Sequence, residues 1–236
     1  MSSQNARAVT EKLTAVDPAR TNILACATVI EDMRSMLPLQ MSYEVLDFGR
    51  HINPKALRST LQEKVNNSPP GIETIVLGYG LCSMAVVGLK ANGHTLIVPR
   101  VDNCIGILLG SQDVYRKQVY DYPGTYYLSR GWIKAGNTLL DEYEALAERY
   151  GWEKSRLVFS RILKHYSRVA FINTGSDGLE CYQTHARRMA AQFGLRYGEI
   201  TCSDALFGKM LHGPWDKGFV IATPGEIISY LDFKRF

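Results

Sequence analysis

The sequence predicts an α/β protein made of two Rossmann-like lobes, each built on a parallel sheet. Short apolar, β-branched runs alternate with segments of helical spacing along the chain, an arrangement typical of parallel sheets. The order strand, helix, strand, helix, strand also occurs twice, over residues 22–78 and 168–223. This recurrence indicates two lobes. An internal duplication is a hypothesis that rests on the shared element order, without shared identity.

The first lobe is predicted over residues 22–133, after an N-terminal arm at 1–21. Thr28 and Glu31 form the T-x-x-E pattern of a capping box, which favours a helix directly after the first strand. Ser83 is expected to cap a later apolar helix. The predicted strands are 22–27, 43–48, 74–77, 95–99 and 125–128, and the predicted helices are 29–37, the segment after Pro54, 84–89 and the segment after Ile105.

A helical bridge and a second lobe are predicted for the rest of the chain. Apolar side chains at helical spacing predict helices within 134–167, which we expect to join the lobes. The second lobe is predicted over 168–236, with Asp177 and Glu180 repeating the capping pattern. Its strands are expected at 169–173, 195–200 and 219–222.

Composition narrows the range of functions. Hydrophobic residues make up 46% of the 236 residues and charged residues 21%, as in ordinary globular proteins. The net charge of +4 is not gathered into a basic stripe, so nucleic-acid binding is not expected. No apolar run approaches the roughly 20 residues that span a bilayer. The N-terminus lacks a signal-peptide core, so we expect a cytoplasmic protein with no membrane partner.

Cysteines mark the candidate site. There are five, and an odd number argues against a disulfide framework. Cys26, Cys82 and Cys104 each follow a predicted strand, near a helix N-terminus that would favour a thiolate. In a sheet of order 2-1-3-4 these strands are neighbours about 4.8 Å apart, so we expect the three thiols to converge. Cys181 and Cys202 are expected to be buried.

Three converging thiols suit a metal site. We predict that Cys26, Cys82 and Cys104 are ligands to zinc or to an iron–sulfur cluster, with His51 a candidate fourth ligand. The choice between the two metals stays open. The alternative is a cofactorless enzyme in which two facing cysteines act as acid and base, as in racemases and isomerases.

Residues around the thiols are predicted to bind substrate and cofactor. Arg100 and Asp102 follow the fourth strand and are the predicted catalytic residues, with Arg100 suited to clamp a carboxylate or phosphate of a small-molecule substrate. Gly78, Gly80 and Ser83 form the predicted cofactor-binding turn. Ser83 stands where G-x-G-x-x-G requires its third glycine, so a dinucleotide is not expected.

Four blocks carry a resemblance to a known family: ILACATVIEDM, VLGYGLCSMAVVGL, VPRVDNCIGILLGS and PGTYYLSRGW. The chain resembles, over about residues 22–228, an uncharacterised family of bacteria and methanogenic archaea that is known as a domain of unknown function. Members often share Cys26, Cys82 and Cys104. The chain departs from the family at Val101 and at Asn103, where an acidic residue is expected, so no base is assigned at position 103.

The resemblance also implies a metabolic setting. The family is often encoded beside corrinoid methyltransferases, which implies a role in methyl or one-carbon metabolism by association. We therefore predict a cysteine-clustered metal-site protein, enzyme or accessory factor, in corrinoid-linked metabolism. A further alternative is a non-catalytic partner of a corrinoid protein or methyltransferase.

Overall fold

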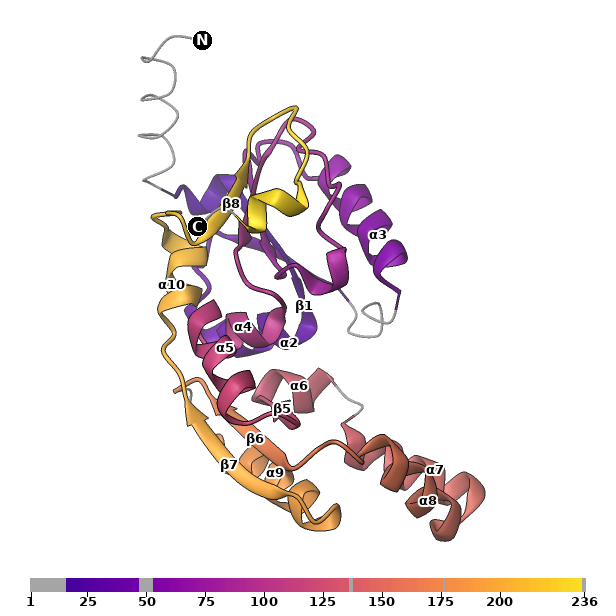
Figure 1. Ribbon diagram of the computed structural model, residues 1–236. Coiled ribbons are helices and arrows are strands. Elements are labelled where there is room, and N and C mark those ends of the chain that lie inside the picture. The colour runs from indigo at the N-terminus through magenta and orange to yellow at the C-terminus, as the bar shows by residue number, and fades with distance from the viewer. Residues whose placement is uncertain (1–15, 47–52, 136–137, 176, 235–236) are drawn as a thin grey trace.

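Two separate β-sheets organise the chain in a computed structural model that describes residues 16–46, 53–135, 138–175 and 177–234 (Figure 1). The first sheet has the order β2-β1-β3-β4-β8 and the second β5-β6-β7. All pairings are parallel except that of β8 with β4, which confirms the predicted fold class. The strands are β1 (Thr21–Cys26), β2 (Ser42–Leu46), β3 (Thr74–Gly78), β4 (Thr95–Pro99), β5 (Thr125–Leu128), β6 (Arg168–Asn173), β7 (Arg196–Thr201) and β8 (Phe219–Ala222).

Helices cover both faces of the first sheet. The α-helices are α2 (Ala27–Met33), α3 (Pro54–Asn66), α4 (Cys104–Leu108), α5 (Gln112–Asp121), α6 (Arg130–Ala135), α7 (Leu139–Tyr150), α8 (Trp152–Ile162), α9 (Glu180–Gln192) and α10 (Ala205–His212). Short 3-10 helices are η1 (Pro18–Arg20), η2 (Arg34–Met36), η4 (Cys82–Met84) and η5 (Tyr230–Phe233). One apolar cluster joins the sheet to α2, α4 and α10, and another joins it to α3 and the C-terminal segment.

The central strands are buried on both faces, which explains their continuous apolar sequence. Successive side chains of a strand point to opposite faces. In β1, Ile23 and Ala25 accordingly join the cluster on the α2 side, whereas Leu24 and Cys26 join the cluster on the α3 side. Every residue of β1 is buried.

The segment at 134–167, which the sequence predicted as a helical bridge, contains helices α7 and α8. Helices α7 and α8 pack on the second lobe, where Tyr143 meets Phe159 and Phe193 with ring centroids 5.3 Å apart in each pair. Figure 1 shows these helices at the end of the molecule away from the first sheet. Their apolar faces are matched by the end of α9 rather than by the first lobe, and this aromatic packing decides their position.

The strands are shared between the lobes differently from the prediction. β5, predicted in the first lobe, pairs with β6, whereas β8, predicted in the second lobe, pairs antiparallel with β4. The second lobe is therefore inserted within the first. The proposed internal duplication is wrong for β8, because this strand is antiparallel to its neighbour and belongs to the first sheet. β8 covers an edge of β4 that would otherwise leave backbone groups unpaired.

Both predicted capping boxes are also wrong. Helix α2 begins at Ala27, with Cys26 rather than Thr28 as its N-cap. Helix α9 begins at Glu180 after Leu179, with no side-chain cap bond. Thr28 instead lies in the first turn of α2, where its hydroxyl has a different partner, described below.

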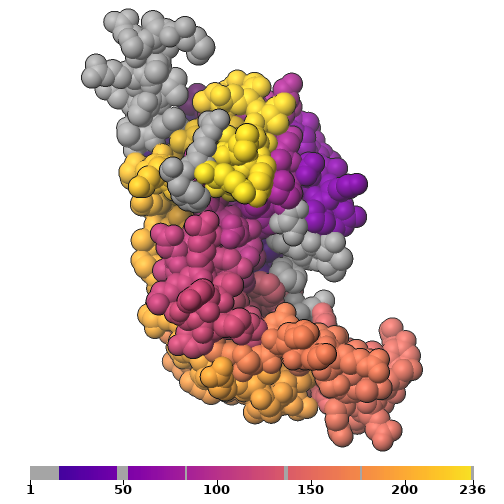
Figure 2. Space-filling view, in the orientation of Figure 1, coloured from indigo at the N-terminus to yellow at the C-terminus, as the bar shows by residue number. Residues whose placement is uncertain are grey.

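The lobes meet where α6 packs against α2. A Cβ on Gly131 would collide with the backbone oxygen of Thr28, so this approach requires glycine. The Gly131 N–H donates to Asp32 Oδ2 at 3.2 Å, and Arg130 donates to the backbone oxygen of Glu31. Figure 2 shows the segment around α4 and α5, in magenta, between the first lobe above and the second lobe below. Among the described residues, every helix is too short or too polar to span a bilayer.

The buried carboxyl group of Asp32 should make stability depend on pH. Burial raises its pKa from 3.8 to about 6, against hydrogen bonds from Ser129 and Gly131 that lower it. The folded state thus holds the proton more tightly than the unfolded state, so stability is greatest below the unfolded pKa and falls as pH rises through about 6.

Asp32→Asn should remove this loss. Between pH 4 and pH 7 the wild type is expected to lose roughly 2.4 kcal/mol of unfolding free energy relative to the variant, because most of the change from a pKa of 3.8 to about 6 falls within this range. Urea unfolding of both proteins at the two pH values measures the difference. If the unfolding free energies of the two proteins changed equally with pH, the folded protein would not hold the Asp32 proton more tightly than the unfolded one.

Candidate functional site

Three cysteines lie at the carboxyl edge of three neighbouring strands. Cys26 ends β1, Cys82 begins η4 after β3, and Cys104 begins α4 after β4. These strands are adjacent in the order β1-β3-β4, as the sequence predicted. All three thiols are buried. They lie close enough that Cys26 raises the pKa values of both Cys82 and Cys104. We call this group the three-thiol cluster.

Backbone contacts between two loops bring the thiols together. The Leu81 N–H donates to the backbone oxygen of Val101 at 2.8 Å, and the Cys82 N–H donates to that of Asp102 at 3.0 Å. A Cβ on Gly80 would lie 2.6 Å from the Val101 oxygen. Gly80 is therefore needed for the close approach of the β3 and β4 loops, which carry Cys82 and Cys104.

The predicted helix at 84–89 is absent, and the backbone around Cys82 is strained. Cys82 has φ 43° and Met84 has φ 71°, conformations that cost on the order of 1–3 kcal/mol in non-glycine residues. The Gly88 N–H donates to the backbone oxygen of Ile228, so the C-terminal segment takes a bond that a helix would use internally. Such strain clusters at functional sites.

Burial has a larger effect on the pKa values of Cys82 and Cys104 than the nearby backbone N–H groups. It raises the pKa of Cys82 to about 12, although the N–H groups of Gly80 and Cys104 point to this sulfur and lower it. Burial likewise raises the pKa of Cys104 well above its usual value, against the N–H groups of Cys104 and Ile105. These N–H groups lower the pKa values, in the direction that the sequence predicted, but desolvation of the sulfurs has the larger effect.

Cys26 has a hydroxyl beside its sulfur. Its Sγ lies 3.1 Å from Thr28 Oγ1, and the two share a hydrogen bond. This bond occupies the hydroxyl that the sequence pattern assigned to helix capping. The spacing Cys-x-Thr at a helix start is a signal that could have indicated the contact.

The arrangement does not form a ready-made ligand set. In the part of the chain that the structure describes, no three His, Cys, Asp or Glu side chains are placed so that they could hold a metal ion. His51 lies outside the described residues, and so does the side chain of Ser83. A metal at Cys26, Cys82 and Cys104 therefore stays a prediction, supported by the donor type and the proximity of the sulfurs.

The two predicted catalytic residues have different surroundings. The Asp102 carboxylate accepts from Gln112 Nε2 at 2.6 Å, while the Asp102 N–H donates to Gln112 Oε1 at 2.8 Å. Arg100 lines a cavity between β8 and helices α5 and α10. The buried Gln112 fixes the β4 loop to α5, and no local pattern in the sequence indicated this role.

Two residues named in the sequence patterns have packing or capping roles. A Cβ on Gly78 would overlap the Ala25 side chain, so this glycine allows β3 to pack closely on β1. Asn103 caps α4, accepting from the Gly106 N–H at 3.2 Å and donating to Tyr115 Oη at 2.9 Å. Asparagine is among the residues that helices prefer at this capping position.

The fold and site define an α/β protein with a buried cluster of three cysteines at the edge of its parallel sheet. The chain belongs to the family described as "Protein of unknown function (DUF1638)", whose model matches residues 45–211. This match includes Cys82 and Cys104, and it confirms the resemblance to an uncharacterised family. No curated protein and no solved structure matches the chain.

The cluster should be chemically silent in the folded protein. Cys181, which the sequence predicted to be buried, is exposed. The pKa of Cys82, by contrast, is about 12, which leaves about one thiol in 10⁵ ionised at neutral pH. Iodoacetamide should therefore label Cys181 first, and peptide mass spectrometry over time measures the order. Cys181→Ser should abolish the fast phase. Labelling of Cys82 as fast as Cys181 in the native protein would contradict the burial and the raised pKa.

Proposed function

We propose that Cys26, Cys82 and Cys104 together hold a soft metal centre, either zinc or an iron–sulfur cluster. The observation that carries this proposal is the convergence of three buried thiols, from three adjacent strands, within electrostatic reach of one another. Thiolates are the preferred ligands of both centres. Whether the protein acts as an enzyme or as an accessory factor stays open in this proposal.

The raised pKa values favour a metal over thiol catalysis. A cysteine that acts as a general base needs a pKa near the working pH, whereas that of Cys82 is about 12. A bound soft cation deprotonates its thiol ligands and removes the repulsion between them. The two-cysteine racemase alternative would also leave the third buried thiol without a role.

Groups around the sulfurs suit thiolate ligands. The N–H groups of Gly80 and Cys104 point to the Cys82 sulfur, and those of Cys104 and Ile105 point to the Cys104 sulfur. Hydrogen bonds of this kind stabilise metal-bound thiolates. Since the side chains do not yet form a ligand set, binding would require the sulfurs to turn toward a common point. A zinc ion or cluster held by three thiolates keeps an open position, where a substrate can bind and be activated.

Metal content tests the proposal. Protein purified without oxygen, from cells supplied with iron and zinc, should contain stoichiometric metal by elemental analysis. Iron–sulfur absorption in the visible spectrum separates a cluster from colourless zinc. Cys26→Ser, Cys82→Ser and Cys104→Ser should each lose most of the metal, because each removes a ligand.

Matched controls come from the remaining two cysteines. Cys181→Ser and Cys202→Ser change the same side chain outside the cluster and should retain the metal. Circular dichroism of every variant excludes loss by unfolding. Wild-type protein that stays free of metal under these conditions would overturn the metal centre and favour the paired-thiol alternative.

We further propose a role in corrinoid-linked methyl or one-carbon metabolism, in the cytoplasm, with a corrinoid protein or methyltransferase as partner. The family resemblance supports this setting, and the five cysteines, none of which is in a disulfide bond in the structure, agree with a reducing compartment. The wild type should co-elute with a corrinoid protein of the same organism in gel filtration. If Cys104→Ser still co-elutes with the corrinoid protein, the interaction is independent of the cluster, as expected for a non-catalytic partner. Failure of the wild type to co-elute with it argues against the partnership.

A further inference from the structure

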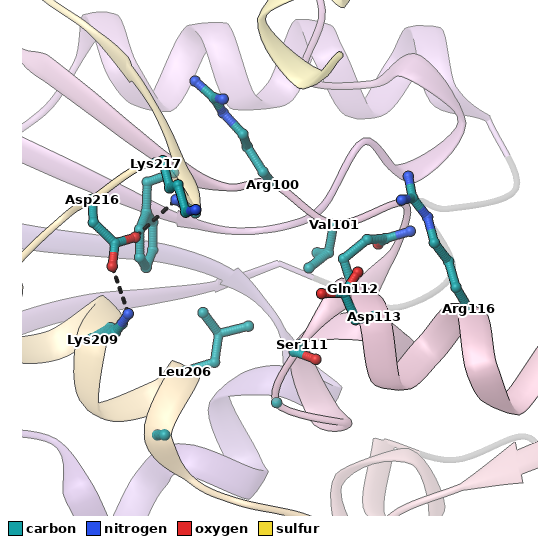
Figure 3. Close-up of a pocket in the computed structure, with 14 residues that line it drawn as sticks. Arg100, Val101, Ser111, Gln112, Asp113, Arg116, Leu206, Lys209, Asp216 and Lys217 are labelled. Atoms are coloured by element: carbon teal, nitrogen blue, oxygen red, sulfur yellow. Dashed lines mark hydrogen bonds and ion pairs between the residues drawn. The ribbon is translucent and has the colours of Figure 1, made fainter. Parts of the chain in front are cut away.

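A second candidate site lies beside the β4 loop. A cavity of about 450 Å³ opens between the end of β4, the start of β8 and helices α5 and α10 (Figure 3). This volume is typical of small-molecule sites. None of the three cysteines lines it, although the loop at 100–104 reaches both places.

The lining of the cavity carries an excess of positive charge. Its cationic residues are Arg100, Arg116, Lys209 and Lys217, against the acidic residues Asp113 and Asp216. Asp216 is already engaged, because it accepts from Lys209 Nζ at 2.6 Å and from the Gly218 N–H at 2.8 Å. These contacts lower its pKa. Asp216 and Lys209 thus neutralise each other, and the charges that remain in the lining are those of Arg100, Arg116 and Lys217 against Asp113.

The start of α5 adds to this excess of positive charge. Ser111 caps the helix, its hydroxyl accepting from the Val114 N–H at 3.1 Å, and Ser111 and Gln112 both line the cavity. A helix N-terminus carries a partial positive charge that favours anions. Figure 3 shows Lys217, Arg100 and Arg116 on different elements around the cavity, with the guanidinium group of Arg100 directed away from Leu206 and Ser111.

Apolar side chains form part of the wall. Leu206, 9% exposed, is the most accessible of three apolar side chains that line the cavity; the other two are Val101 and Phe219, which are almost fully buried. A bare inorganic anion would make no use of these side chains. The cavity therefore suits an organic molecule whose apolar body contacts the apolar side chains and whose anionic group contacts the cationic ones.

The walls are held in place before any ligand binds. The Arg100 N–H donates to the backbone oxygen of Gly218 at 2.8 Å, which joins β4 to the turn before β8. A Cβ on Gly110 would lie 2.6 Å from the backbone oxygen of Ser203, so the turn before α5 and the segment before α10 are in close contact. Preformed walls reduce the entropy lost on binding.

We propose that this cavity binds a small organic oxyanion, a phosphate ester or a dicarboxylate attached to an apolar body. The proposal is independent of the metal centre, since the cavity contains no cysteine.

Isothermal titration with simple probes tests the site. Phenyl phosphate and isophthalate carry the same ring with a phosphate or two carboxylates, so comparing them identifies the preferred anion. Inorganic phosphate, which lacks the ring, should bind at least tenfold more weakly than phenyl phosphate. Lys217→Met should weaken the better probe by roughly tenfold, through loss of a charged contact. Ala205→Trp, at the exposed first residue of α10, should block the cavity and abolish binding.

Lys55→Met is the matched control, because Lys55 is an exposed lysine of α3 remote from the cavity lining. It should bind the probes as the wild type does. The proposal is overturned if no probe binds, if Lys55→Met and Lys217→Met weaken binding equally, if Ala205→Trp binds normally, or if phosphate binds as well as phenyl phosphate. Metal analysis of Lys217→Met, expected to match the wild type, separates failure here from failure of the metal centre.

Discussion

The close contact between the β3 and β4 loops is the constraint on which the site depends. Leu81 and Cys82 donate backbone hydrogen bonds to Val101 and Asp102, and Gly80 leaves no side chain between the loops. This contact holds Cys82 in a left-handed conformation beside the start of α4. Because Cys104 is the first residue of α4, the same contact sets the distance between two thiols of the cluster.

Two features of the surroundings have opposite effects on the charge of the thiols in the cluster. Burial favours neutral thiols, whereas backbone N–H groups aimed at two of the sulfurs favour thiolates. Without a cation, burial is the stronger effect. A soft cation would reverse the balance, since the donors already in place would then stabilise the charge that the cation requires on its ligands.

The position of α2 connects this cluster to the second lobe. Its first residues follow Cys26, and its last turn contains Asp32, which accepts a hydrogen bond from the Gly131 N–H of α6. The second lobe is inserted in the first, so the chain must return to form β8 and α10. That return also builds the cationic cavity against the β4 loop, so both candidate sites border one loop.

Local sequence determined the strands and most helices, because buried parallel strands read as apolar runs and α3 repeats Leu57, Leu61 and Val65 on one face. It also placed Cys26, Cys82 and Cys104 after adjacent strands, since strand order follows from short connections. Only the tertiary structure decided the pairing of β8 with β4 and the tie between Asp102 and Gln112, because these depend on partners distant in sequence. It likewise decided the protonation of the thiols, since burial is a property of the whole fold and outweighs the local effect of a helix N-terminus.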